Sequence, residues 1–165
     1  MLLSVVTLLF SCGKQNRQVE SNLSGIVDES LNYAKSIYGD KVEIVLTGDL
    51  TAESKMDAIA LVVKKKLGEG SYWIQKGCVI EKSGDKWGVI LSMDEKLKST
   101  KGELIPQENA VNGYLLSFDQ FKSPTSFNIT MADSTGKPSS DEAVIKWNTK
   151  TAAYEMSIAG DNLAP

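Results

Sequence analysis

The spacing of apolar residues along the chain first predicts a helix. Four apolar residues share the three-and-four spacing of one helix face: Val27, Leu31, Ala34 and Tyr38. Ser24 stands where an N-cap would, and Gly39 can end the helix in the left-handed conformation. The pattern therefore predicts one amphipathic helix ahead of the rest of the domain.

After Gly39 the apolar period changes to two, which is typical of strands. Strand-length segments cover residues 41–47, 58–63, 71–81, 86–94, 113–121, 126–133, 142–148 and 152–158. Residues 83–85 and 148–151 have the composition of hairpin turns, and residues 95–109 form a longer polar excursion. Because most connections are short and no helix separates the strands, the sheet should be antiparallel.

The predicted fold class is thus α+β. One N-terminal amphipathic helix should pack on a mainly antiparallel sheet of about eight strands, arranged as a meander, a sandwich or a half barrel. Strict alternation would put Val42, Ile44 and Leu46 on one face of their strand. On the strand expected over residues 86–94, it would likewise place four residues on one face: Trp87, Val89, Leu91 and Met93. The unbroken apolar run 58–63 predicts a strand buried on both faces.

The composition excludes several classes of function and catalytic mechanism. The chain of 165 residues suits one domain, and its net charge of −3 gives no electrostatic reason to expect nucleic-acid binding. It contains no histidine and two cysteines, which excludes Ser-His-Asp and Cys-His mechanisms and cysteine-rich zinc sites. The remaining options are carboxylate chemistry or a function without catalysis.

The amino terminus has the pattern of a targeting segment. An apolar run from Leu2 to Phe10 is too short to span a bilayer, which takes roughly 20 residues, but it has the length of a signal-peptide core. "LFSC", Leu9 to Cys12, resembles the lipobox of bacterial lipoproteins. The resemblance implies cleavage after Ser11, lipid on Cys12 and a membrane anchor. No Lys or Arg precedes the apolar core, which departs from the usual pattern.

This resemblance divides the chain into three parts. Residues 1–11 would be a lipoprotein signal peptide, 12–22 the lipidated cysteine with a flexible tether, and 23–165 a single globular α+β domain. Gly13, rather than aspartate, follows Cys12, which in such lipoproteins favours the outer membrane of a bacterium that has two membranes. Cys78 begins an apolar strand and is expected to be a buried core residue.

The loop "DLTAESKMD" is a candidate metal site. It resembles the Asp-rich calcium loop of FG-GAP repeats, D-x-[DN]-x-D-G-x-x-D followed by an apolar strand. The match assigns four ligands: Asp49, Thr51, Glu53 and Asp57. Ser54 stands where the pattern has glycine, and a non-glycine residue in the left-handed conformation costs about 1–2 kcal/mol. A connecting loop without metal is the other interpretation of this segment.

These patterns favour a non-catalytic, lipid-anchored module of the bacterial cell envelope that binds an envelope protein, a polymer or a small ligand. One alternative is a calcium-dependent binding module using the Asp49–Asp57 loop, and another is an envelope hydrolase using a pair of carboxylates. Five aromatic residues could form a ligand groove or pack in the core: Tyr72, Trp73, Trp87, Trp147 and Tyr154.

Overall fold

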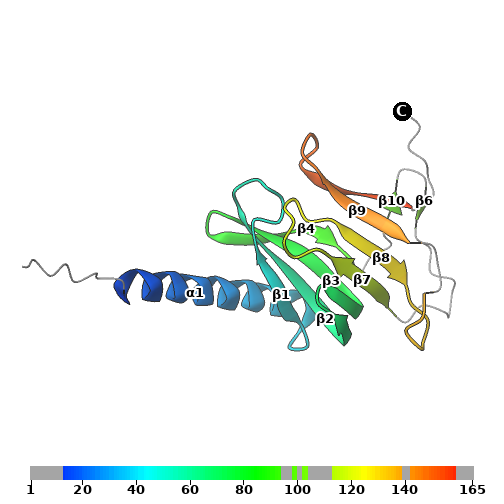
Figure 1. Ribbon diagram of the computed structural model, residues 1–165, viewed down its shortest axis with the longest axis horizontal. Coiled ribbons are helices and arrows are strands. Elements are labelled where there is room, and N and C mark those ends of the chain that lie inside the picture. The colour runs from blue at the N-terminus through cyan, green and yellow to red at the C-terminus, as the bar shows by residue number, and fades with distance from the viewer. Residues whose placement is uncertain (1–12, 94–97, 100–101, 104–112, 139–141, 159–165) are drawn as a thin grey trace, which may run out of the picture.

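The computed structural model describes residues 13–93, 98–99, 102–103, 113–138 and 142–158, as one helix and a curved sheet (Figure 1). The elements are α1 (Gly13–Tyr38), β1 (Glu43–Gly48), β2 (Met56–Gly68), β3 (Ser71–Ser83), β4 (Lys86–Ser92), β5 (Lys98–Ser99), β6 (Gly102–Glu103), β7 (Tyr114–Phe118), β8 (Phe127–Met131), β9 (Ala143–Asn148) and β10 (Ala153–Ile158). The predicted α+β fold class is confirmed, and each predicted strand is present.

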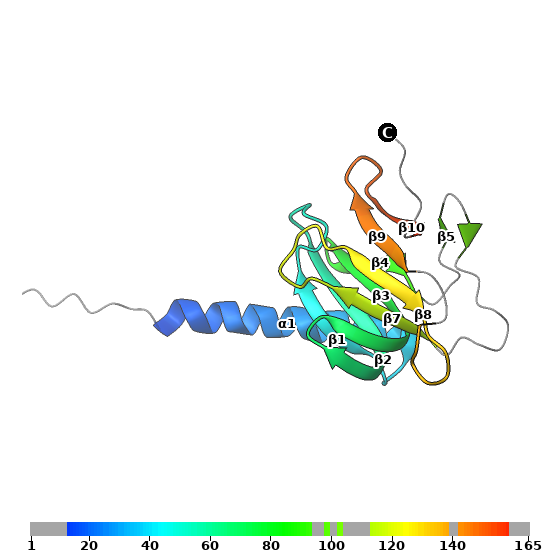
Figure 2. The same cartoon turned by 45° about the vertical axis from the view of Figure 1, so that its right-hand side comes forward.

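Helix α1 is longer than the apolar stripe predicts. It begins at Gly13, so Ser24 lies inside the helix and is not its N-cap, and the flexible coil expected over residues 13–22 is wrong. Residues 14–22 contain no proline or glycine and include Lys, Gln, Arg and Glu, which are good helix formers. No residue in this stretch therefore interrupts the helix. Its first part stands clear of the sheet (Figures 1 and 2). The predicted signal peptide 1–11 and Cys12 lie outside the described residues.

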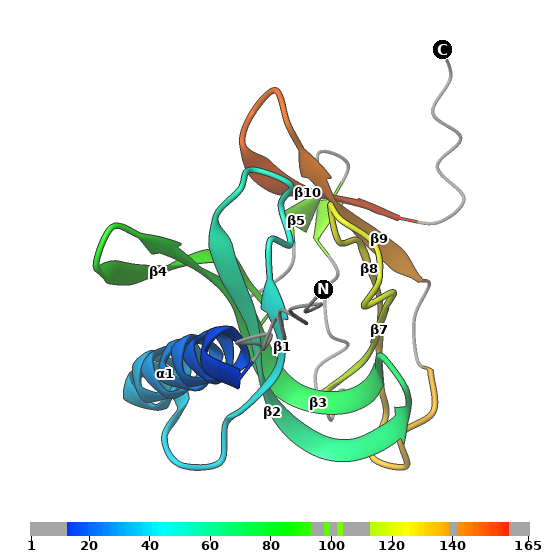
Figure 3. The same cartoon turned by 60° about the vertical axis from the view of Figure 1, so that its left-hand side comes forward.

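The sheet is open and branches at β3. Its strand order is β1-β2-β3-β7-β8-β9-β10-β5-β6, and β4 also pairs with β3. One end of β3, Ser71–Ile74, pairs with β7, while the other end, Cys78–Ser83, pairs with β4. All pairs are antiparallel except the short one between β10 and β5. Viewed from the side of the helix N-terminus, the sheet curls into a half barrel (Figure 3).

Two β-bulges overturn the predicted alternation of faces. The register of β1 shifts between Ile44 and Leu46, so Ile44 packs toward the helix while Leu46 packs in the concave core. The register of β4 shifts opposite Val79 and Ile80, which leaves Val89 exposed while Leu91 packs in the concave core. An extra residue in one strand exchanges the faces of all residues that follow it.

Two hydrophobic clusters cover the two faces of β2. On the outer face, α1 packs against small residues of β2 and β3, namely Ala58, Ala60 and Cys78. Cys78 is fully buried there, as predicted. On the concave face, Ile59 and Leu61 join the main core with Phe127 and other residues of the distant strands. Both faces of the first half of β2 therefore exclude water, which explains the unbroken apolar run 58–63, whereas the strand is exposed from Lys64 onward.

Gly77 of β3 lies so close to β2 that there is no room for a side chain. A Cβ atom at Gly77 would lie 2.5 Å from Leu61 Cδ2 and 2.8 Å from the Ala60 carbonyl oxygen. The Gly77 carbonyl also accepts a 3.0 Å hydrogen bond from the Tyr38 hydroxyl, which fixes the end of α1 on the sheet. A side chain at this position would separate β2 from β3 and disturb the docking of the helix.

We expect Gly77→Ala to lower the free energy of unfolding by about 1–3 kcal/mol, the usual effect of overpacking. Gly68→Ala is the matched control, because a Cβ at this strand glycine would meet nothing within 4 Å. Urea denaturation of both variants measures the difference. Equal midpoints for the two variants would contradict the close packing at Gly77.

Candidate functional site

The acidic loop between β1 and β2 is held together by its own carboxylates. Asp49 is exposed, and its two carboxylate oxygens accept hydrogen bonds from the backbone N–H of Glu53 at 3.0 Å and of Ser54 at 2.9 Å. Ala52 and Ser54 both have positive φ, 61° and 59°. The loop thus adopts the left-handed conformation at Ser54 that the calcium pattern assigns to glycine, and the Asp49 carboxylate stabilises it.

Asp57 holds the same loop from the inside. Its side chain is fully buried, and Oδ2 accepts hydrogen bonds from Leu50 N at 2.8 Å, Thr51 N at 3.1 Å and Thr51 Oγ1 at 3.2 Å. The Leu50 carbonyl in turn accepts a 2.7 Å bond from the backbone N–H of Thr125. Asp57 therefore fixes the turn at Leu50 and Thr51, and the Leu50 carbonyl links this turn to the β7–β8 loop.

The four predicted calcium ligands have different surroundings. Asp49 is exposed, Glu53 pairs with Lys55 at 3.1 Å, and Thr51 and Asp57 are buried against each other. In the part of the chain that the structure describes, no three His, Cys, Asp or Glu side chains are placed to hold a metal ion. The hydrogen bonds give these residues a structural role, and calcium binding stays a hypothesis.

An acidic pair on the concave face bears on the hydrolase alternative. Asp57 of β2 and Glu81 of β3 are cross-strand partners, and Glu81 pairs with Lys55 at 3.0 Å. Burial raises the pKa of the Asp57 carboxyl to about 6, against the lowering effect of hydrogen bonds from Leu50 and Thr51, and nearby Glu81 adds to the rise. Because Asp57 is fully buried, no substrate reaches this pair, and the pair does not favour a hydrolase.

Tyr154 of β10 adds a second buried polar group near Asp57. Burial, and the nearby Asp57 charge, raise the pKa of its phenol above the usual value. Neither Tyr154 Oη nor Asp57 Oδ1 has a hydrogen-bond partner among the described residues. The ring packs edge-on against Phe127 and Trp147, with centroids 5.6 and 5.0 Å apart. Phe127 and Tyr154 belong to the concave core, whereas Trp147 also lines a depression of 410 Å³ with residues of β9, β10 and the turn between them.

The five aromatic residues considered from the sequence do not share one surface. Tyr72 and Tyr154 pack against the concave core, and Trp87 packs against the cluster beneath α1. Trp73 lies under Gly136 and the Lys64 ammonium, whose nitrogen is 5.2 Å from the ring centroid. A single aromatic ligand groove is therefore wrong for this set.

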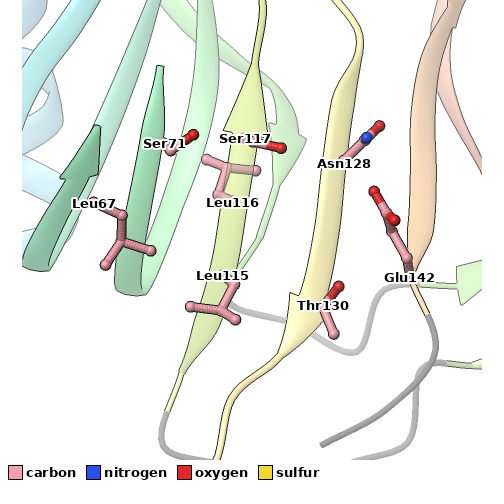
Figure 4. A pocket seen from close by; sticks show the side chains of 8 residues that line it. All are labelled: Leu67, Ser71, Leu115, Leu116, Ser117, Asn128, Thr130 and Glu142. Atoms are coloured by element: carbon pink, nitrogen blue, oxygen red, sulfur yellow. The ribbon is translucent and has the colours of Figure 1, made fainter. Parts of the chain in front are cut away.

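A polar groove lies on the outer face of β7 and β8, where the sequence patterns predicted no site. Its volume is 230 Å³, and Figure 4 shows the residues that line it: Leu67, Ser71, Leu115, Leu116, Ser117, Asn128, Thr130 and Glu142. Strand register aligns Ser71 with Ser117 and Ser117 with Asn128, forming a row across three strands. Neighbouring strands lie about 4.8 Å apart, so this row presents hydroxyl and amide groups at regular intervals.

A second depression continues the first. Its volume is 390 Å³, and it shares Ser117 and Asn128 with the groove while adding Lys122 and Ser126. Phe121, in the adjoining β7–β8 loop, is 86% exposed. We call the two depressions together the outer groove. It is an elongated, open surface with hydroxyl, amide and charged groups, and exposed apolar side chains lie beside it.

The polar row could have been found only with the strand pairing in hand. Ser117, Asn128 and Thr130 occupy alternating outward positions of two strands, which look like an ordinary solvent-facing pattern in sequence. Their side chains make no hydrogen bond to other described residues, so they are available to a ligand.

Comparison of the chain with protein-family models, with curated proteins and with solved structures gave no match. The one helix that the structure describes, α1, lacks the long apolar stretch that crossing a membrane requires. Arguments about function therefore depend on the residues and their geometry.

The buried Asp57 predicts an unusual pH dependence of stability. Its folded pKa of about 6 exceeds the ordinary value of 3.8, so the folded protein binds this proton more tightly than the unfolded chain does. The resulting stability, on the order of 2 kcal/mol, is present below about pH 4 and lost as the pH rises through about 6. Asp57→Asn keeps an oxygen acceptor for the loop amides and removes the charge.

We expect the Asp57→Asn protein to melt at a higher temperature than the parent at neutral pH, with the difference shrinking toward about pH 4. Asp85→Asn, in the exposed β3–β4 turn, is the control and should leave the pH profile unchanged. Melting temperatures across this range provide the measurement. A difference from the parent that grows as the pH falls would contradict the raised pKa.

Proposed function

We propose that the protein is a lipid-anchored, non-catalytic binding module of the bacterial cell envelope, and that the outer groove binds an envelope polymer rich in hydroxyl groups. The single observation that carries the proposal is the row of Ser71, Ser117 and Asn128 on an open, elongated surface. Hydroxyl and amide groups both donate and accept hydrogen bonds, which suits the hydroxyls of a glycan.

The shape of the outer groove supports a polymer rather than a small molecule. Small-molecule sites are usually concave and bury most of the ligand, whereas this surface is shallow and extends over two adjoining depressions. A chain molecule can gain affinity from many weak contacts along such a surface. Leu67, half exposed at the rim, adds an apolar contact for the ring carbons of a sugar.

The anchor rests on the lipobox resemblance at Leu9 to Cys12. The lipid on Cys12 would hold the protein on the membrane, and Gly13 favours the outer membrane in a bacterium with two membranes. The first part of helix α1 then serves as a stalk in place of the expected coil: residues 13–26, which precede the part of the helix that lies against the sheet, extend about 21 Å at about 1.5 Å per residue. A stalk of this kind would carry the domain away from the membrane, toward a polymer in the envelope.

Cys12→Ala should move the protein from the membrane fraction to the soluble fraction of the producing bacterium, because the lipid would have no attachment site. Cys78→Ala changes the other cysteine, which is buried beneath α1, and should leave the protein in the membrane fraction. Fractionation followed by immunoblotting measures both. A Cys12→Ala protein that stays with the membranes would contradict the lipid anchor.

Asn128→Ala should weaken binding to purified peptidoglycan about fivefold, the effect of losing roughly 1 kcal/mol of hydrogen bonding. Asn32→Ala, an exposed asparagine of α1, is the matched control and should bind as the parent does. Co-sedimentation with purified sacculi measures the affinity. Equal affinity of both variants, or no binding by the parent, would contradict a glycan site in the outer groove.

A further inference from the structure

The polar row of the outer groove continues beyond β8. Strand register aligns Asn128 of β8 with Val144 of β9, and Val144 with Ser157 of β10. The row that begins at Ser71 and Ser117 therefore crosses five strands, β3, β7, β8, β9 and β10. Because neighbouring strands lie about 4.8 Å apart, the row is about 19 Å long. The outer groove thus leads to the outer face of the β9–β10 hairpin.

A depression of 410 Å³ lies at this hairpin, where the row ends. Ile145 and Met156 pack in the concave core, so the residues that alternate with them along β9 and β10 face outward. Four of these outward-facing residues line the depression: Lys146, Asn148, Glu155 and Ser157. Because Ser157 also belongs to the polar row, the depression and the outer groove share one face of the sheet.

The hairpin depression carries two lysines without ion pairs. Lys146 and Lys150 are exposed, and neither ammonium pairs with another residue in the part of the chain that the structure describes. Glu155, the cross-strand partner of Lys146, is bound by neutral groups: its Oε1 accepts hydrogen bonds from Asn148 Nδ2 at 2.8 Å and Thr151 Oγ1 at 3.1 Å. Two positive charges therefore accompany one negative charge here, in a protein whose net charge is −3.

The charge of the outer surface changes along β9. Glu142, directly before the strand, lines the first depression of the outer groove, whereas Lys146 and Lys150 lie toward and beyond the other end of the strand. Lys122 in the second depression is already paired, with its nitrogen 3.7 Å from the Asp119 carboxylate. Among the described residues of this surface, the hairpin is therefore where ammonium groups remain available to an acidic ligand.

We propose that the polymer bound by the outer groove is acidic, and that Lys146 and Lys150 bind its carboxylate groups at the β9–β10 hairpin. This inference rests on the proposed function, because it names the class of polymer for the same surface. Hydroxyl groups of the polymer bind along the row from Ser71 to Asn128, and its carboxylates reach over β9 to the hairpin. Lysine suits this contact, since its flexible stem and three donors can follow a mobile anionic group.

The test compares native sacculi with sacculi whose carboxylates have been converted to amides by carbodiimide and excess ammonium chloride. We expect the parent to bind native sacculi about fivefold more tightly, the effect of two exposed ion pairs. The double variant Lys146→Gln with Lys150→Gln should lose this preference and bind both preparations as the parent binds amidated sacculi. Lys41→Gln with Lys86→Gln is the matched control, because it removes two exposed lysines away from the hairpin and should keep the preference.

The outcomes separate this inference from the glycan site itself. Circular dichroism should show all variants folded, and added salt should reduce the preference of the parent, because exposed charges are screened. A parent that binds native sacculi no more tightly than amidated sacculi, while Asn128→Ala still binds more weakly, would overturn the acidic polymer and leave the glycan site in place. Absence of binding to either preparation would overturn both. An equal loss for both preparations in the Lys146 and Lys150 variant would overturn the assignment of these lysines to carboxylates.

Discussion

The architecture depends on the burial of β2 on both of its faces. Alanines at 58 and 60 allow α1 to approach the outer face, while Ile59 and Leu61 enter the core enclosed by the curved sheet. At the start of the strand, Asp57 lies on the same side of β2 as Ile59 and Leu61, at a position where an apolar residue would be expected. Its carboxylate instead binds the backbone of Leu50 and Thr51, so a buried polar group fixes the loop over that end of the core.

The same arrangement explains why the outer face of β7 and β8 and the edge of β1 are exposed in the described part of the chain. Helix α1 covers β2 and β3, and no other described element covers the outer face of β7 and β8. At the other side of β2, the strand β1 has no further partner among the described residues and remains an edge. The groove over β7 and β8 and the free edge of β1 thus both follow from a single helix covering only part of a long, curled sheet.

The sequence predicted the element types well because they depend on local patterns. The apolar stripe of α1, the stop at Gly39 with φ of 76° and the turn at 83–85 all require only neighbouring residues. The faces of β1 and β4 were predicted wrongly, because the bulges near Val45 and Ile90 arise from pairing with distant strands. The start of α1 was also missed, because a helix without an apolar stripe has no periodicity to detect.

The candidate site shows the same division between local and long-range information. The acidic loop was recognised from its spacing, but the partners of its carboxylates, including the link from Leu50 to Thr125, depend on the fold. The outer groove was not recognised, since Ser71, Ser117 and Asn128 lie far apart in sequence and become one row only through strand register. An ordinary polar face and a binding face have the same composition until the pairing is known.

The outer groove is tested most directly by mapping chemical shifts of the isotope-labelled protein during titration with soluble peptidoglycan fragments. The largest changes should fall on Ser71, Ser117, Asn128 and Thr130, and residues of the concave core such as Ile59 should not shift. Changes confined to other surfaces, or no changes at fragment concentrations that saturate known glycan-binding domains, would contradict the assignment of the outer groove as the binding surface.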